Sequence, residues 1–84
     1  STSPMNTIMH ALSLRPKGTT IFHISYQTGK QNTIFFSGTT QTREALSTFR
    51  NSLQNDPAFK NVSVPVEDLV GNNSTFSVTL TGNF

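Results

Sequence analysis

The residues that acid–base or metal chemistry would require are few and far apart. His10 and His23 are the only histidines, and neither has an Asp or Glu at a spacing that would complete a metal site. Glu67 and Asp68 are adjacent, so on an extended backbone their side chains would point to opposite sides and not converge on one bond. We therefore interpret the histidines as surface groups and the carboxylates as solvated loop charges. The sequence predicts no catalytic residue and no metal ligand.

Motifs for nucleophiles and cofactors are missing as well. None of the many Ser and Thr residues lies in a strand–turn–helix elbow of the G-x-S-x-G kind, and no phosphate-binding glycine loop occurs. The chain has no cysteine, which excludes a disulfide framework and a thiolate metal site. Its six Lys and Arg residues are scattered against four Asp and Glu residues, without a basic tract. We predict no enzyme activity, no cofactor and no nucleic-acid partner.

The length of the chain, residues 1–84, suffices for a single domain with one modest core. Within it, hydrophobic periodicity predicts two helices. The first helix is expected over residues 4–14, where Arg15 before a proline ends it. The second is expected over residues 41–54, capped by Thr40 or Thr42. Residues that recur at i, i+3, i+4 and i+7 in the first helix are Met5, Ile8, Met9 and Leu12. The core residues of the second are Leu46, Phe49 and Leu53.

Alternation of apolar and polar residues predicts strands at 19–27, 32–38, 61–66 and 75–81. In the first strand, Phe22 shares the core-facing side with Ile24 and Tyr26, which leaves Ile21 on the outer face. Gly38 is expected to end the second strand, and Phe35 to join Ile21 on the outer face. Pro65 lies inside the third run, which indicates an edge strand. Residues 67–74 are interpreted as a polar connection with its tip at 71–73.

The same order of helix, strand, turn and strand occurs twice, at a spacing of roughly forty residues. Neither half can bury its apolar face alone, so the two halves should merge. The predicted fold is therefore α+β and ferredoxin-like: a circularly permuted αββ-αββ duplication, with a four-stranded antiparallel sheet and two helices on one face.

Apolar and cationic residues that these elements leave exposed are candidates for a partner interface. Arg43 and Arg50 lie seven positions apart on one flank of the second helix, either as an interface rim or as charges above the core. Exposed Ile21 and Phe35 would suit a protein contact, while base stacking on an open sheet stays an alternative. The complete candidate set is Met5, Ile8, Met9, Leu12, Ile21, Phe35, Arg43 and Arg50.

Core and turn residues along most of the chain resemble the extracytoplasmic domain of PilN-type fimbrial assembly proteins. The residues that carry the resemblance are Pro16-Lys17-Gly18, Tyr26, Ser37-Gly38, Thr42-Arg43-Glu44-Ala45-Leu46, Phe49, Leu53, Phe59, Val62 to Pro65 and Phe76-Ser77-Val78-Thr79-Leu80. PilO proteins and the GspL and GspM proteins of type II secretion are similar at this level. A ferredoxin-like nucleic-acid or small-ligand binding module is the alternative of a different class.

The resemblance implies a bitopic protein of the bacterial inner membrane with this domain on the periplasmic side. Its function would be that of a scaffold for type IV pilus assembly, acting as a homodimer or as a heterodimer with a PilO-like partner. A PilM-like protein would bind only through an N-terminal tail. Neither that tail motif nor an apolar run of the ~20 residues that a membrane helix requires occurs in residues 1–84.

Overall fold

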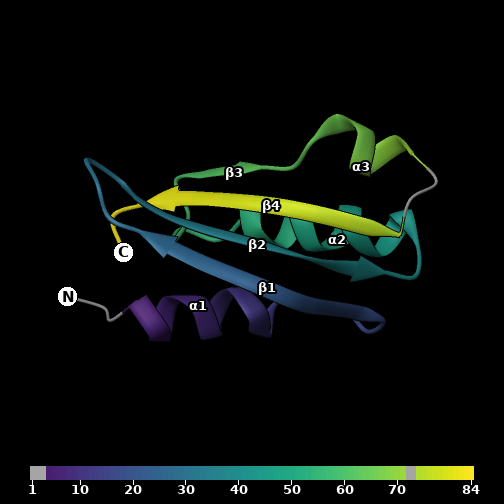
Figure 1. The fold of residues 1–84 in the computed structure, drawn as a ribbon, viewed down its shortest axis with the longest axis horizontal. Coiled ribbons are helices and arrows are strands. Elements are labelled where there is room, and N and C mark those ends of the chain that lie inside the picture. Colours follow the sequence, from purple (N-terminus) through teal and green to yellow (C-terminus); the bar gives the residue numbers. More distant parts are fainter. Residues whose placement is uncertain (1–3, 72–73) are drawn as a thin grey trace.

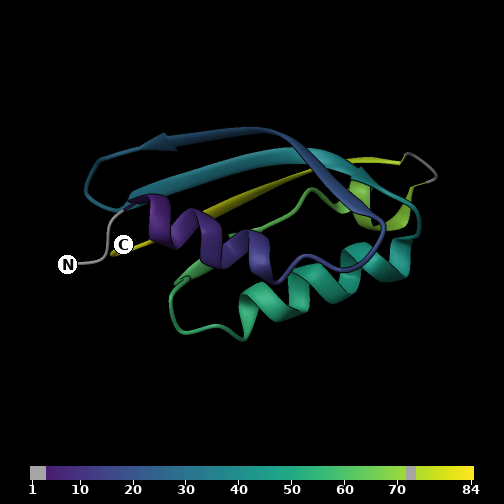
Figure 2. The ribbon, with the colours of Figure 1, turned by 90° about the horizontal axis from the view of Figure 1, so that it is seen from below.

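The computed structural model describes residues 4–71 and 74–84 of the chain. Its strands form one antiparallel sheet in the order β1-β2-β4-β3. Helices α1 and α2 lie on the same face of this sheet (Figures 1 and 2). The elements are α1 (Pro4–Ser13), β1 (Thr19–Gln27), β2 (Asn32–Thr40), α2 (Arg43–Gln54), β3 (Asn61–Ser63), α3 (Val66–Val70) and β4 (Thr75–Gly82).

The predicted fold class is confirmed. Apart from the short helix α3, moving β4 to the front of the chain would give the βαββαβ order of a ferredoxin-like fold. The element order is therefore that of a permuted αββ-αββ chain. The two halves meet in the centre of the sheet, where β2 pairs with β4 along its whole length.

The core lies between the sheet and α2. Thr42 caps α2, because its side-chain oxygen accepts a hydrogen bond from Ala45 N at 3.0 Å. The ring of Phe49 lies 5.6 Å from that of Phe36 and 6.3 Å from that of Phe76. The buried hydrophobic residues are Ala11, Ile34, Phe36, Leu46, Phe49, Leu53, Phe59, Phe76, Val78 and Leu80. All three residues that the sequence places in the core of the second helix are among them.

Gly38 lies inside β2 and does not end it, so the predicted end of this strand at residue 38 was wrong. It is paired with Ile21 on one side and with Phe76 on the other. A Cβ atom on Gly38 would lie only 1.9 Å from the carbonyl oxygen of Thr20. Glycine is needed here because the β1 backbone approaches β2 too closely for a side chain. The strand then continues to Thr40.

This close approach adjoins a β-bulge, where the register of β1 shifts between Ile21 and His23. A bulge places two residues opposite one and reverses the alternation of side chains along the strand. Ile21 consequently packs against the core, and Phe22 is 65% exposed. The prediction of Phe22 as a core-facing residue and of Ile21 as an outer one was therefore wrong. Ile24 and Tyr26, beyond the bulge, keep the predicted side: they pair with Phe36 and Ile34, which face the core.

The third strand is also shorter than the predicted segment 61–66. It ends at Ser63, and Pro65 occupies the N-cap position of the helix α3, without a side-chain capping hydrogen bond. Proline suits a helix start because it has no N–H to leave unpaired, and Glu67 and Asp68 then lie in the first turn, where negative charge is favoured. Part of the predicted connection 67–74 is thus helical. Its predicted tip includes residues 72 and 73, which lie outside the described residues.

The first prediction concerns the close approach at Gly38. We expect Gly38→Ala to lower the free energy of unfolding by about 2–3 kcal/mol, because a methyl group has to push the Thr20 carbonyl away. Urea denaturation of the two proteins measures the difference. Gly29→Ala is the matched control, since its Cβ would lie 3.3 Å from its nearest neighbour, Gln31 O. A Gly38→Ala protein as stable as the wild type would contradict the prediction.

Candidate protein-interaction surface

The apolar stripe predicted on the first helix is divided between the core and the surface. Thr7 and Ala11 form the buried side of α1, and Ile8 packs against the core beside them. Leu12 is half-buried. Met5 and Met9, one turn apart, are 62% and 58% exposed. These methionines are therefore available to a partner, whereas Ile8 belongs largely to the domain itself.

The other four predicted interface residues are not brought together. Ile21 faces the core and Phe35 lies half-buried on the outer face, where the ring of His23 is 6.1 Å from it. Arg43 is exposed, and its Nη1 donates to the carbonyl oxygen of Val70 at 3.0 Å, which joins α2 to α3. Arg50 is half-buried, with a buried Nε that has no hydrogen-bond partner among the described residues. Arg43 therefore contributes a hydrogen bond within the domain, and Arg50 is partly buried in it.

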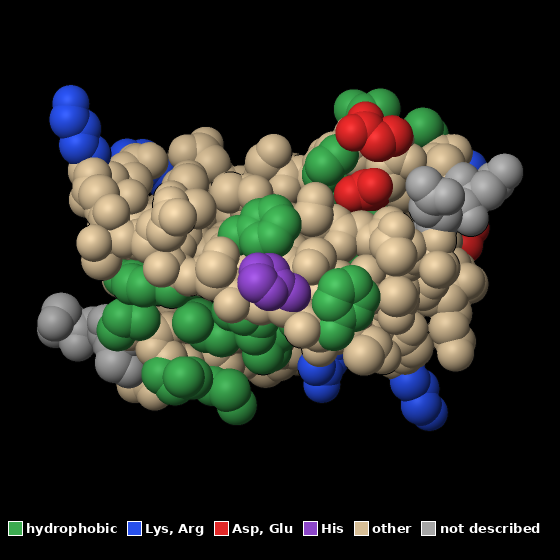
Figure 3. Space-filling view, in the orientation of Figure 1, with side chains coloured by type: hydrophobic (Ala, Val, Ile, Leu, Met, Phe, Trp, Pro, Cys, Tyr) green, Lys and Arg blue, Asp and Glu red, His purple; other side chains and the backbone are tan. Residues whose placement is uncertain are grey.

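Strand β1 forms a long open edge of the sheet. It pairs with β2 on one side, and no strand of the described residues pairs with its other side. Figure 3 shows hydrophobic side chains gathered over α1 and the neighbouring end of β1. We call the free edge of β1 together with the exposed side of α1 the β1–α1 surface, and define it by Met5, Met9, Ile24 and Tyr26. Ile24 is 38% exposed and Tyr26 is half-buried.

The opposite edge of the sheet is closed. Strand β3 pairs with β4 only from Asn61 to Ser63. Beyond that point α3 takes its place, and the Asp68 side chain accepts a hydrogen bond from Ser77 N at 3.1 Å. A carboxylate thus replaces the carbonyl that a neighbouring strand would supply. Short edge strands, prolines and charges are the usual means of blocking edge-to-edge pairing, and Figure 3 shows the acidic residues at α3.

A histidine and an aspartate hold α1 in place. His10 Nε2 lies 2.5 Å from Asp56 Oδ2, in the loop after α2, and the His10 ring stacks on Phe59 with centroids 6.1 Å apart. Asp56 also accepts a hydrogen bond from Ala58 N at 2.9 Å. This backbone hydrogen bond, followed by the contact with His10, lowers the pKa of Asp56 below its ordinary value of 3.8. The two partners are 46 positions apart, so local spacing contains no signal for the pair.

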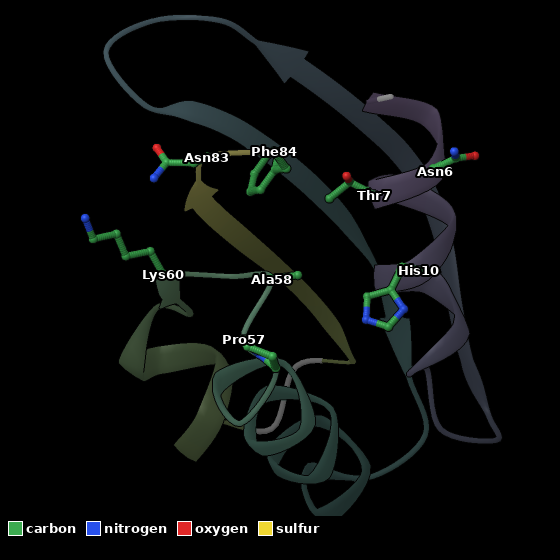
Figure 4. A pocket seen from close by; sticks show the side chains of 8 residues that line it. All are labelled: Asn6, Thr7, His10, Pro57, Ala58, Lys60, Asn83 and Phe84. Carbon is green, nitrogen blue, oxygen red and sulfur yellow. The ribbon is translucent and has the colours of Figure 1, made fainter. Parts of the chain in front are cut away.

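A cavity of about 420 Å³ opens between α1 and the loop that precedes β3. Figure 4 shows Thr7 and His10 on one side and Pro57, Ala58 and Phe84 on the other, with the Lys60 side chain pointing away. No carboxylate is among the described residues that line it. The carboxylate of Asp56 contacts His10 from outside this lining and also accepts the hydrogen bond from Ala58 N. We interpret the cavity as the gap beside a helix that is packed mainly at one side.

Comparisons with protein-family models, with curated proteins and with solved structures found no match for this chain. Within the described part of the chain, no helix combines the length and hydrophobicity needed to cross a membrane. The same residues contain no group of three or more side chains that could hold a metal ion. The geometry of the two sheet edges is therefore the main basis for a functional proposal.

The second prediction concerns the closed edge. We expect Asp68→Ala to lower the free energy of unfolding by about 1.5–3 kcal/mol, because the part-buried Ser77 N–H loses a charged acceptor. Chemical denaturation measures this cost. Asp68→Asn is the matched control, because its amide oxygen can still accept the hydrogen bond. Equal losses in the two variants would show that charge, and not the hydrogen bond, matters at this edge.

The third prediction concerns the anchor of α1. Because the pKa of Asp56 is lowered in the folded state, its stabilising contribution is complete above the unfolded value near 3.8 and is lost as pH falls through the folded value. Asp56→Asn should therefore flatten the decline of unfolding free energy below about pH 4–5. Denaturation over a pH series measures the slope. Glu67→Gln, an exposed carboxylate on α3, is the control; an unchanged slope in Asp56→Asn would contradict the prediction.

Proposed function

We propose that this chain is a protein-interaction domain that acts as a structural scaffold by binding a like-folded partner at the β1–α1 surface. The observation that carries the proposal is the difference between the two edges of the sheet. One edge is closed by α3 and Asp68, whereas the other is a nine-residue strand with no Lys, Arg, Asp, Glu or Pro. A strand edge without blocking residues is a template for pairing with another chain.

The exposed side of α1 supports the same location. Met5 and Met9 are exposed apolar groups of α1, the helix that lies beside this open edge (Figure 1), and methionine packs adaptably against irregular surfaces. A partner that pairs with β1 would also cover these side chains. In this role the domain contributes affinity and orientation, with no catalytic step.

The resemblance to PilN-type proteins gives the proposal a biological setting. We propose a scaffold domain of the inner-membrane complex that assembles type IV pili, on the periplasmic side, with a PilO-like protein or a second copy as partner. An assembly domain of the GspL or GspM kind in type II secretion is the neighbouring possibility. In either setting, a membrane helix and, for a PilM-like partner, an N-terminal tail would come from outside residues 1–84.

The fourth prediction tests the surface. The double variant Met5→Gln, Met9→Gln should weaken association by on the order of tenfold, because two exposed apolar contacts are lost while the core is untouched. Sedimentation equilibrium of the domain alone, and mixed with a PilO-like domain, measures the association constant. Thermal unfolding should be unchanged, since neither side chain is buried.

The matched control is Val66→Gln, Val70→Gln on α3, which removes two equally exposed apolar groups at the closed edge; they are 67% and 63% exposed. This control should associate like the wild type. If the Val66→Gln, Val70→Gln variant weakened association more than the methionine variant, the interface would lie at the other edge of the sheet. Strictly monomeric behaviour of the wild type at high concentration, alone and in the mixture, would overturn the proposed function.

A further inference from the structure

The hydrogen-bond pattern of the sheet identifies which backbone groups of β1 are free. In an antiparallel sheet each residue directs its N–H and C=O to one side, and successive residues alternate. Thr40 N donates to Ser74 O at 2.8 Å, so the even-numbered residues of β2 are directed toward β4. The odd-numbered residues, Ser37 and Phe35 among them, are then directed toward β1. Together with the strand pairing, this one bond fixes the direction of the residues of β2, of β4 and of β1 after its bulge.

Strand β4 provides an independent check. Phe36 opposes Val78 and Ser37 opposes Ser77, so the alternation directs Val78 toward β2 and Ser77 away from it. The hydrogen bond from Ser77 N to Asp68 has this direction. The alternation deduced from Thr40 therefore holds across the sheet.

The same alternation applies to β1 after the bulge, where it leaves the backbone N–H and C=O groups of two residues without a partner among the described residues. His23 opposes Ser37 and Ser25 opposes Phe35, so His23 and Ser25 bond to β2. Ile24 lies between these two residues and Tyr26 follows Ser25. Both direct their backbone N–H and C=O away from β2, toward the free edge of the sheet. These are the backbone groups that a further strand would bind.

We infer that a second copy of this chain pairs with the first, β1 against β1 and antiparallel, about a two-fold axis through Ser25. This inference rests on the proposed function and specifies the partner and register at the same surface. With the axis at Ser25, Ile24 of each copy opposes Tyr26 of the other. Each such pair exchanges both N–H···O=C bonds, so all the free groups of both residues are used.

Other registers use these groups less well. A shift by one residue places Ile24 opposite a residue whose groups are already bonded to β2. A further shift in either direction pairs Ile24 or Tyr26 with itself and leaves the other residue opposite the bulge or the hairpin turn. The register through Ser25 is therefore the one that the free groups of a second copy satisfy together.

The side chains agree with this arrangement. Ile24 and Tyr26 of opposite copies form a pair of a β-branched and an aromatic residue on the helix side. On the outer side, His23 opposes Gln27 and Ser25 opposes itself, so no like charges of Lys, Arg, Asp or Glu meet. Because α1 lies beside this end of β1 (Figures 1 and 2), the axis also brings the two α1 helices toward each other. An interface of this limited extent should associate weakly.

Single cysteines test the register, because the chain has none of its own. Ser25→Cys would face itself across the axis as a pair that is not hydrogen-bonded, with Cα atoms about 4.5 Å apart, within the range of a disulfide. We expect a covalent dimer under mild oxidation. His23→Cys and Gln27→Cys should each stay uncrosslinked, since each lies about 13 Å from its own copy, whereas an equimolar mixture of the two should crosslink. Thr48→Cys, exposed on α2, is the control for random collision.

The outcomes separate this inference from the proposed function. Crosslinking of Ser25→Cys and of the His23→Cys and Gln27→Cys mixture, well above the Thr48→Cys control, supports the register. If the wild type dimerises by sedimentation but these variants do not crosslink above the control, the register is wrong and the proposed interaction role survives. If the domain associates only with a PilO-like protein, the second copy is the wrong partner. Circular dichroism confirms that each variant is folded.

Discussion

The contact between the backbone of β1 and Gly38 is the constraint on which the rest of the sheet depends. With 1.9 Å between a hypothetical Cβ and the Thr20 carbonyl, only glycine fits at this position. The bulge next to it brings Ile21 into the core and moves Phe22 to the outer face. It also divides β1 into two parts. After His23, the backbone N–H and C=O groups alternate regularly between β2 and the free edge. Packing, the exposed outer face and the open edge are therefore all consequences of one local irregularity.

The two edges of the sheet show how a small domain can direct association to one side. Both edges present backbone donors and acceptors, but α3 and the Asp68 carboxylate satisfy Ser77 at one of them. At the other, the groups of Ile24 and Tyr26 have no partner strand in the described part of the chain. Blocking one edge restricts pairing to the other, which limits open-ended aggregation and favours a closed dimer. The proposed scaffold role depends on this difference more than on any single exposed side chain.

Much of the fold is predictable from the sequence because regular elements carry periodic patterns. The core of α2, with Leu46 and Phe49, follows from helical spacing, and β4 follows from strict alternation. The bulge does not, because Ile21 and Phe22 are both apolar and either suits the core; only the fit against Gly38 selects one. The helix α3 had a signal in Pro65 followed by two acidic residues, but valines in alternation favoured a strand. For the candidate surface, the methionines were predicted as interface residues together with Ile8 and Leu12, without the division between core and surface that the structure shows. The free direction of the backbone groups was not predicted, since it depends on the pairing of strands far apart in sequence.

The attachment of α1 connects stability to association. Only Thr7 and Ala11 of this helix are fully buried, and the contact of His10 with Asp56 supplies a second attachment at the surface. The helix therefore depends less on the core than α2 does, which buries three large apolar side chains. In a chain of 84 residues with a modest core, a partner at the β1–α1 surface would cover the side of α1 that the domain leaves exposed. Binding would then stabilise the folded state by mass action, so that the same surface that recruits the partner completes the packing of the domain.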